Sequence, residues 1–156
     1  MNKEKSLLVQ LELVWWVFTA LVAFAFVFPI TSKIANYPFL LLNIIFILIF
    51  LTFGRYFLFL KHTFLAKRQK MKMVVFLLCI PLLMFLVNQL NIFQTLVVER
   101  GVESFIRDIP YGDQFSLANY IFKEMQFFGV GAIIVSILLP FRLLLSIWRV
   151  RNRGTV

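Results

Sequence analysis

The composition of this 156-residue chain excludes most classes of soluble protein. Hydrophobic residues make up 62% of it, charged residues make up 15%, and the mean hydropathy is +0.91. A soluble domain of this length cannot bury so much apolar surface, because about half of its residues must face water. A soluble enzyme, a nucleic-acid-binding module and a disordered chain are therefore excluded, and the net charge of +9 is first a signal of membrane topology.

Four apolar runs are long enough to cross a bilayer as helices. They are Leu7–Ile30, Phe39–Leu60, Met73–Val98 and Phe127–Trp148. At ~1.5 Å of rise per residue, about 20 residues cover a ~30 Å hydrocarbon core, and lipid offers no hydrogen-bond partner to an open sheet edge. We therefore expect a single all-α domain over residues 1–156, an antiparallel bundle with spans at about residues 7–30, 39–60, 73–98 and 120–148.

The first run also resembles a signal peptide, which leaves an alternative open. It has a basic start and the sequence Ala23-Phe24-Ala25, which is similar to a signal-peptidase site. However, the apolar run continues through Phe28 without a polar region, and Glu12 interrupts it. We expect an uncleaved helix, and cleavage would leave the other three helices with the same orientation.

The basic residues predict which ends of the helices face the cytoplasm. Ten Lys and Arg residues lie in the terminal segments and the 61–72 connection on one side, and three, Lys33, Arg100 and Arg107, lie in the 31–38 and 99–119 connections on the other side. The ten are Lys3, Lys5, Lys61, Lys67, Arg68, Lys70, Lys72, Arg149, Arg151 and Arg153. Since positively charged segments remain in the cytoplasm, both termini and the 61–72 connection are predicted to be inside, with residues 31–38 and 99–119 outside.

Three ionisable residues form a candidate charge cluster within the apolar runs. With alternating helix directions, Glu12, Arg55 and Arg142 fall in one layer near the cytoplasmic side, about 8 Å into the span. A carboxylate in lipid is costly unless it is paired, which favours an ion pair of Glu12 with Arg55 or Arg142. Alternatively, both arginines extend to the lipid phosphates while Glu12 reaches the interface or is protonated. A transport or catalytic role is the third option, although one acid cannot relay a proton without a second group to receive it.

Amide side chains mark the outer half of three of the runs. Asn88 and Asn91 fall on one helix face with Thr95, and Asn43 and Gln126 lie at comparable outer depths. Hydrogen bonds between helices, worth about 0.6 kcal/mol each, are the structural explanation of this polar outer cluster. A shallow cavity for a lipid headgroup or a small solute is the functional explanation. Amides can orient such a ligand but cannot act as acid or base.

The two longer connections lead to further predictions. The 61–72 connection contains no Gly or Pro and is expected to be helical, and its cations are expected to bind anionic lipid headgroups. These cations are Lys61, Lys67, Arg68, Lys70 and Lys72.

In the outer connection, Val98–Ile109 has apolar and charged residues at helical spacing, which predicts a short amphipathic helix on the bilayer surface or against a partner.

No residue pattern in the chain predicts catalysis. One cysteine, Cys79, and one histidine, His62, exclude an internal disulfide, a thiolate metal cage and a bis-histidine haem site. We expect no cofactor and no enzyme, since a lipid-modifying activity would lack a nucleophile. The expected function is a multi-pass accessory or assembly subunit of a bacterial inner membrane that binds lipids, other membrane proteins or itself. The alternative is a small oligomeric transporter or channel lined by Asn43, Asn88 and Asn91. Nothing beyond charge supports a nucleic-acid partner.

Overall fold

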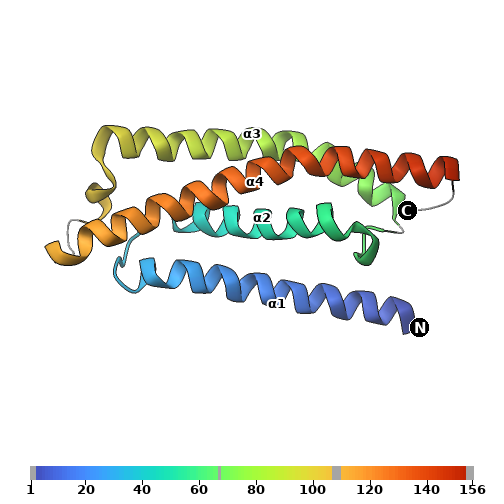
Figure 1. The fold of residues 1–156 in the computed structure, drawn as a ribbon, viewed down its shortest axis with the longest axis horizontal. Coiled ribbons are helices and arrows are strands. Elements are labelled where there is room, and N and C mark those ends of the chain that lie inside the picture. Colours follow the sequence, from blue (N-terminus) through green and yellow to red (C-terminus); the bar gives the residue numbers. More distant parts are fainter. Residues whose placement is uncertain (1–2, 67, 107–109, 154–156) are drawn as a thin grey trace.

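Four long helices make up the computed structural model of the protein, which describes residues 3–66, 68–106 and 110–153. They are α1 (Lys3–Thr31), α2 (Leu40–Phe59), α3 (Gln69–Arg100) and α4 (Tyr111–Arg153). All four are long and apolar enough to span a membrane, which confirms the expected helical bundle. The start of α1 and the end of α4 lie together at what we call the terminal end, and the α1–α2 and α3–α4 connections lie at the far end (Figure 1).

The fourth helix begins earlier than expected. It starts at Tyr111 rather than near residue 120, and it has 43 residues. Pro110 precedes the helix and its carbonyl accepts a bond from the N–H of Asp113 at 3.0 Å. The Asp113 carboxylate lies in the first turn, where its negative charge interacts favourably with the positive end of the helix dipole. The turn residues of this segment therefore mark the start of a helix rather than a long loop.

The core lies where α2, α3 and α4 meet. Its fully buried apolar side chains include Phe46, Ile47, Leu86, Phe93, Ile121, Met125 and Ala132. Two glycines of α4 allow the close approach of these helices. A Cβ atom on Gly129 would lie 2.8 Å from Leu90 Cδ1, and one on Gly131 would lie 2.7 Å from the Phe50 ring. Small residues at such positions let neighbouring helices pack closely in a membrane.

Helix α1 lies at the edge of the bundle, beside α2 (Figure 1). Its contributions to the core are Ala23, Val27 and Ile30, all in its half toward the far end. Most of its other large apolar side chains face outward, and Phe24, for example, is 65% exposed. Such a surface is favourable in lipid and unfavourable in water.

The connection between α2 and α3 differs from the sequence prediction. Only a short 3₁₀ helix, Leu60–His62, follows α2, so the 61–72 connection is not one continuous helix. Thr63 ends it by adopting an extended backbone conformation, and its hydroxyl donates a hydrogen bond to the Leu60 carbonyl at 2.8 Å. A local side-chain bond of this kind competes with helix continuation.

The connection between α3 and α4 also differs. Helix α3 continues to Arg100 and ends at Gly101, whose φ of 70° is a conformation that favours glycine. A second 3₁₀ helix follows over Val102–Phe105. The amphipathic helix predicted over Val98–Ile109 is therefore interrupted at Gly101, and the rest of that prediction, at residues 107–109, lies outside the described residues.

Candidate functional site

A charged anchor joins α1 to α2 near the terminal end. Arg55 Nη1 donates a hydrogen bond to Glu12 Oε2 at 2.7 Å, and the two side chains are 8% and 15% exposed. Glu12 Oε1 accepts a bond from the backbone N–H of Phe64 at 2.9 Å. The Arg55 guanidinium also lies over the Trp15 ring, 5.1 Å from its centroid, in a cation–π contact. The Glu12–Arg55 anchor thus ties α1, α2 and the following connection together.

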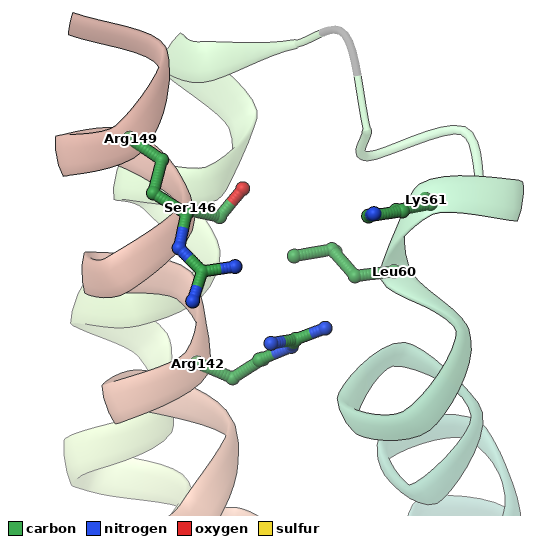
Figure 2. A pocket seen from close by; sticks show the side chains of 5 residues that line it. All are labelled: Leu60, Lys61, Arg142, Ser146 and Arg149. Carbon is green, nitrogen blue, oxygen red and sulfur yellow. The ribbon is translucent and has the colours of Figure 1, made fainter. Parts of the chain in front are cut away.

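Arg142, the other arginine considered for Glu12, lies in a separate crevice on α4. The remaining residues that line this basic crevice are Leu60, Lys61, Ser146 and Arg149. Figure 2 shows the guanidinium groups of Arg142 and Arg149 turned into the same space, with Lys61 across from them. Arg142 Nε is buried without a hydrogen-bond partner among the described residues. The predicted layer of three charges therefore divides into one ion pair and one basic crevice.

A groove with apolar walls opens beside the Glu12–Arg55 anchor. Its volume is about 450 Å³, and its lining residues are Leu11, Val14, Trp15, Phe18, Arg55, Phe59 and His62. The walls of the groove are mainly apolar, and of its two basic residues Arg55 is paired with Glu12 and His62 is exposed.

The basic residues of the 61–72 connection do not all lie at the surface. Lys61, Arg68 and Lys70 are exposed, as expected for side chains that contact headgroups. Lys72 is fully buried, and its Nζ donates a hydrogen bond to Ser146 Oγ on α4 at 2.9 Å. Lys72 therefore does not belong to the predicted headgroup-binding surface, because the first turn of α3 packs against α4. Lys67 lies outside the described residues.

The four amides of the predicted outer cluster do not come together. Asn43 is fully buried in α2, and its Nδ2 donates a hydrogen bond to Glu124 Oε2 on α4 at 2.5 Å. Gln126 is half-buried on α4, whereas Asn88 and Asn91 are exposed on α3. Asn43 thus belongs to the core, and the two α3 amides face away from it.

Glu124 is the functional candidate that the sequence analysis missed. The fourth apolar run begins at Phe127, so Glu124 lies outside it, although Glu124 lies within the expected span of about residues 120–148. The signal was its helical spacing, because Ile121 and Phe128 mark the core face of α4 and Glu124 falls between them on that face. The structure leaves Glu124 only 5% exposed, beside Asn43.

The outward face of α3 is polar in its half toward the far end. Met84, Asn88, Asn91 and Thr95 are spaced by four, three and four residues, which keeps them on one side of a helix. All four are exposed, and Leu77 continues the same face toward the terminal end. We call Asn88, Asn91 and Thr95 the α3 polar face.

The charged and sulfur-bearing groups inside the bundle offer little for metal binding. Within the described part of the chain, no three His, Cys, Asp or Glu side chains are grouped so that they could hold a metal ion. Cys79 is a buried free thiol within α3.

No protein-family model, curated protein or solved structure matches the chain.

Proposed function

We propose that this protein is a non-catalytic, multi-pass inner-membrane protein that acts as an accessory or assembly subunit. The α3 polar face carries the proposal, because Asn88 and Asn91 are exposed on a membrane-spanning helix. A side-chain amide in hydrocarbon loses its hydrogen bonds to water and gains none from lipid. A partner helix with polar groups at the same depth supplies the missing bonds.

The chemistry of the face indicates what kind of partner it takes. An amide group donates and accepts hydrogen bonds, so Asn88 and Asn91 suit Asn, Gln, Ser or Thr side chains of another membrane helix. Such bonds average about 0.6 kcal/mol each, so the two amides specify the register more than they supply affinity. Close van der Waals packing along the same face, at Leu77 and Met84, adds to these bonds, because lipid provides no hydrophobic driving force for helix association.

The proposed orientation places the terminal end in the cytoplasm of a bacterial cell. Exposed Lys61, Arg68 and Lys70 lie in the connection at this end, which fits the tendency of positive segments to stay inside. Each such cation gains about 1 kcal/mol beside anionic headgroups. The guanidinium groups of Arg142 and Arg149 in the basic crevice add to this attraction (Figure 2).

Site-specific photo-cross-linking in cells tests the partner. A photoreactive residue at Met84, which is 71% exposed on the outward face of α3, should give a protein adduct that mass spectrometry identifies as one defined membrane protein. The matched control is Phe24, which is 65% exposed on α1 and should give lipid adducts. A Met84 position that captures only lipid would refute the subunit proposal.

The amides themselves are tested by Asn88→Leu combined with Asn91→Leu. Leucine is apolar and helix-favouring, so the variant should insert and fold while the Met84 adduct falls several-fold. The control replaces Leu78 and Phe85, which are exposed on another side of α3, by other apolar residues and should retain the adduct. An adduct unchanged by loss of both amides would mean that they do not select the partner.

A small oligomeric transporter or channel is the second candidate function. The α3 polar face favours it if the partner is a second copy of this chain. Asn88 and Asn91 would then line a boundary between subunits. Asn43 would not line it, because it is buried against Glu124. Solute flux through proteoliposomes that requires Asn88 and Asn91 would favour this candidate over the subunit role.

A further inference from the structure

A second buried acid lies in the half of the bundle toward the far end. Glu124 of α4 is 5% exposed, and its partner Asn43 of α2 is fully buried. Both belong to helices that are apolar enough to span a membrane. The proposed subunit role does not use either residue, and neither lies on the α3 polar face.

The hydrogen bond between these two residues leaves two oxygen atoms unsatisfied. Asn43 Nδ2 donates to Glu124 Oε2 at 2.5 Å. The other carboxyl oxygen, Glu124 Oε1, and the amide oxygen, Asn43 Oδ1, are buried without a hydrogen-bond partner among the described residues. Each is an acceptor when the carboxyl is ionised, and leaving such a group unsatisfied is costly.

Glu124 forms no ion pair with any residue that the structure describes, which sets it apart from Glu12. Glu12 is bonded to the Arg55 guanidinium and can stay ionised. The hydroxyls of Tyr37, in the α1–α2 connection, and Tyr120, on α4, lie near enough to Glu124 to interact with it electrostatically. Tyr120 donates its hydroxyl to the Phe26 carbonyl of α1 at 2.8 Å. Burial raises the pKa of Tyr37 above its ordinary value, so this hydroxyl also stays neutral.

The charged groups toward the far end lie at the surface on each element. Lys33 follows α1 and is bonded to Asp113 of α4 at 2.7 Å, with both side chains exposed. Lys123, next to Glu124 in sequence, is exposed on α4, and Glu99 and Arg100 are exposed at the end of α3. No cation among these described residues is placed to neutralise the buried carboxylate.

We infer that Glu124 is a proton-binding site, with the proton on Oε1 donated in a hydrogen bond to Asn43 Oδ1. The carboxylate takes this proton from a hydronium ion of the surrounding water, so that one O–H bond of hydronium breaks, the Oε1–H bond forms, and a water molecule and a neutral acid remain. Acid and amide then make two hydrogen bonds, from Asn43 Nδ2–H to Glu124 Oε2 and from Glu124 Oε1–H to Asn43 Oδ1. One proton therefore satisfies both unpartnered oxygens, whereas a divalent cation takes about six or more oxygen ligands.

Proton occupancy of this site controls the contact between α2 and α4. The neutral acid holds Asn43 by two bonds, whereas the ionised acid sets a buried charge against the amide oxygen of Asn43. Loss of the proton therefore favours separation of α2 and α4 or entry of water between them. This inference is independent of the partner at the α3 polar face, because it concerns the interior of the bundle.

Infrared spectroscopy of the full chain in zwitterionic lipid nanodiscs tests the site. At neutral pH the protein should show the C=O band of a protonated carboxyl, and Glu124→Gln should remove that band. Glu12→Gln and Glu99→Gln are the matched controls and should leave it, because one acid is ion-paired and the other is exposed. Absence of the band at neutral pH, or its survival in Glu124→Gln, would overturn the inference.

Stability as a function of pH gives a second, independent readout. Glutamine mimics the neutral acid, because its Nε2 can donate to Asn43 Oδ1, so Glu124→Gln should fold and resist alkaline pH. The unsubstituted protein should lose stability as the pH rises through the titration of Glu124, since a proton bound by the folded state is then removed. A Glu124→Gln variant as sensitive to alkaline pH as the unsubstituted protein would count against the site. Replacing Na⁺ by choline should change neither result, and a band that appears only without Na⁺ would indicate a metal-cation site instead.

Discussion

Glu12 and Glu124 are both acids inside helices that are apolar enough to span a membrane, yet their neighbours differ in kind. Glu12 has a guanidinium at 2.7 Å and a backbone N–H at 2.9 Å, which together stabilise its charge. Glu124 has an amide, which can bond to either form of the acid. Burial alone therefore does not determine what a membrane acid does, because the adjacent donors and charges decide its protonation.

Breaking the Glu12–Arg55 anchor is expected to destabilise the bundle. Glu12→Gln leaves the Arg55 guanidinium buried without its counter-charge, which costs about 3–5 kcal/mol for a buried pair. Adding Arg55→Gln should cause little further loss, because the pair is already broken. Equilibrium unfolding in SDS, followed by circular dichroism, measures these losses. Arg142→Gln is the control, and its loss should add to that of Glu12→Gln because Arg142 lies in the separate basic crevice.

Lys72 leads to a test at a single hydrogen bond. Ser146→Ala removes the acceptor of the buried ammonium and should lower stability by about 1–3 kcal/mol. Lys72→Met keeps most of the side-chain volume and removes the charge, so it should be better tolerated than Ser146→Ala. Thermal unfolding in detergent compares the two variants. Unchanged stability in both variants would show that the Lys72–Ser146 bond contributes nothing to stability.

At the scale of the elements, α1 is fastened to the bundle at two levels. Toward the terminal end the fastening is the Glu12–Arg55 pair. Toward the far end, Tyr120 bonds the Phe26 carbonyl, and Lys33 following α1 bonds Asp113. Since most of the large apolar side chains of α1 face outward, these polar ties determine its position as much as its core contacts do.

The packing of α4 against α2 depends on a glycine whose role can be measured. Gly131→Ala should destabilise the protein by about 1–3 kcal/mol, because the added Cβ meets the Phe50 ring at 2.7 Å. Gly54→Ala on α2 is the matched control, since a Cβ there meets nothing within 4 Å. The control should be neutral or stabilising by up to about 1 kcal/mol, because alanine favours a helix. Unfolding in SDS measures the stability of both variants. A greater loss of stability in Gly54→Ala than in Gly131→Ala would contradict the prediction.

At the scale of the whole molecule, the basic residues predict the orientation in the bilayer. In a Cys79→Ala background, cysteines at Lys70 and Glu99 lie at exposed positions near opposite ends of α3. An impermeant thiol reagent added to intact cells should label Glu99→Cys, and Lys70→Cys should react only after the membrane is opened. Labelling of Lys70→Cys in intact cells would reverse the proposed topology.

Hydrophobic run length was enough to predict the four helices, because spanning a bilayer is a one-dimensional requirement that each segment meets by itself. The spacing of Glu12 and Arg55 from the ends of their runs also placed them at one depth, where the structure brings them together. Segment ends were less predictable. The start of α4 at Tyr111 and the break at Gly101 depend on local backbone conformation, which hydropathy does not report.

The tertiary structure decided which neighbours each polar side chain meets. The depth of a residue along its helix does not specify which side of the helix faces the other helices. The sequence left Arg55 and Arg142 equivalent as partners of Glu12, and helix packing separated them. Packing also turned Asn43 toward the core while leaving Asn88 and Asn91 outside. The sequence by itself thus determined that the chain forms four helices long and apolar enough to span a membrane, with polar groups at given positions along them. The tertiary structure decided which of those groups meet, because side-chain contacts depend on the rotation of each helix about its axis.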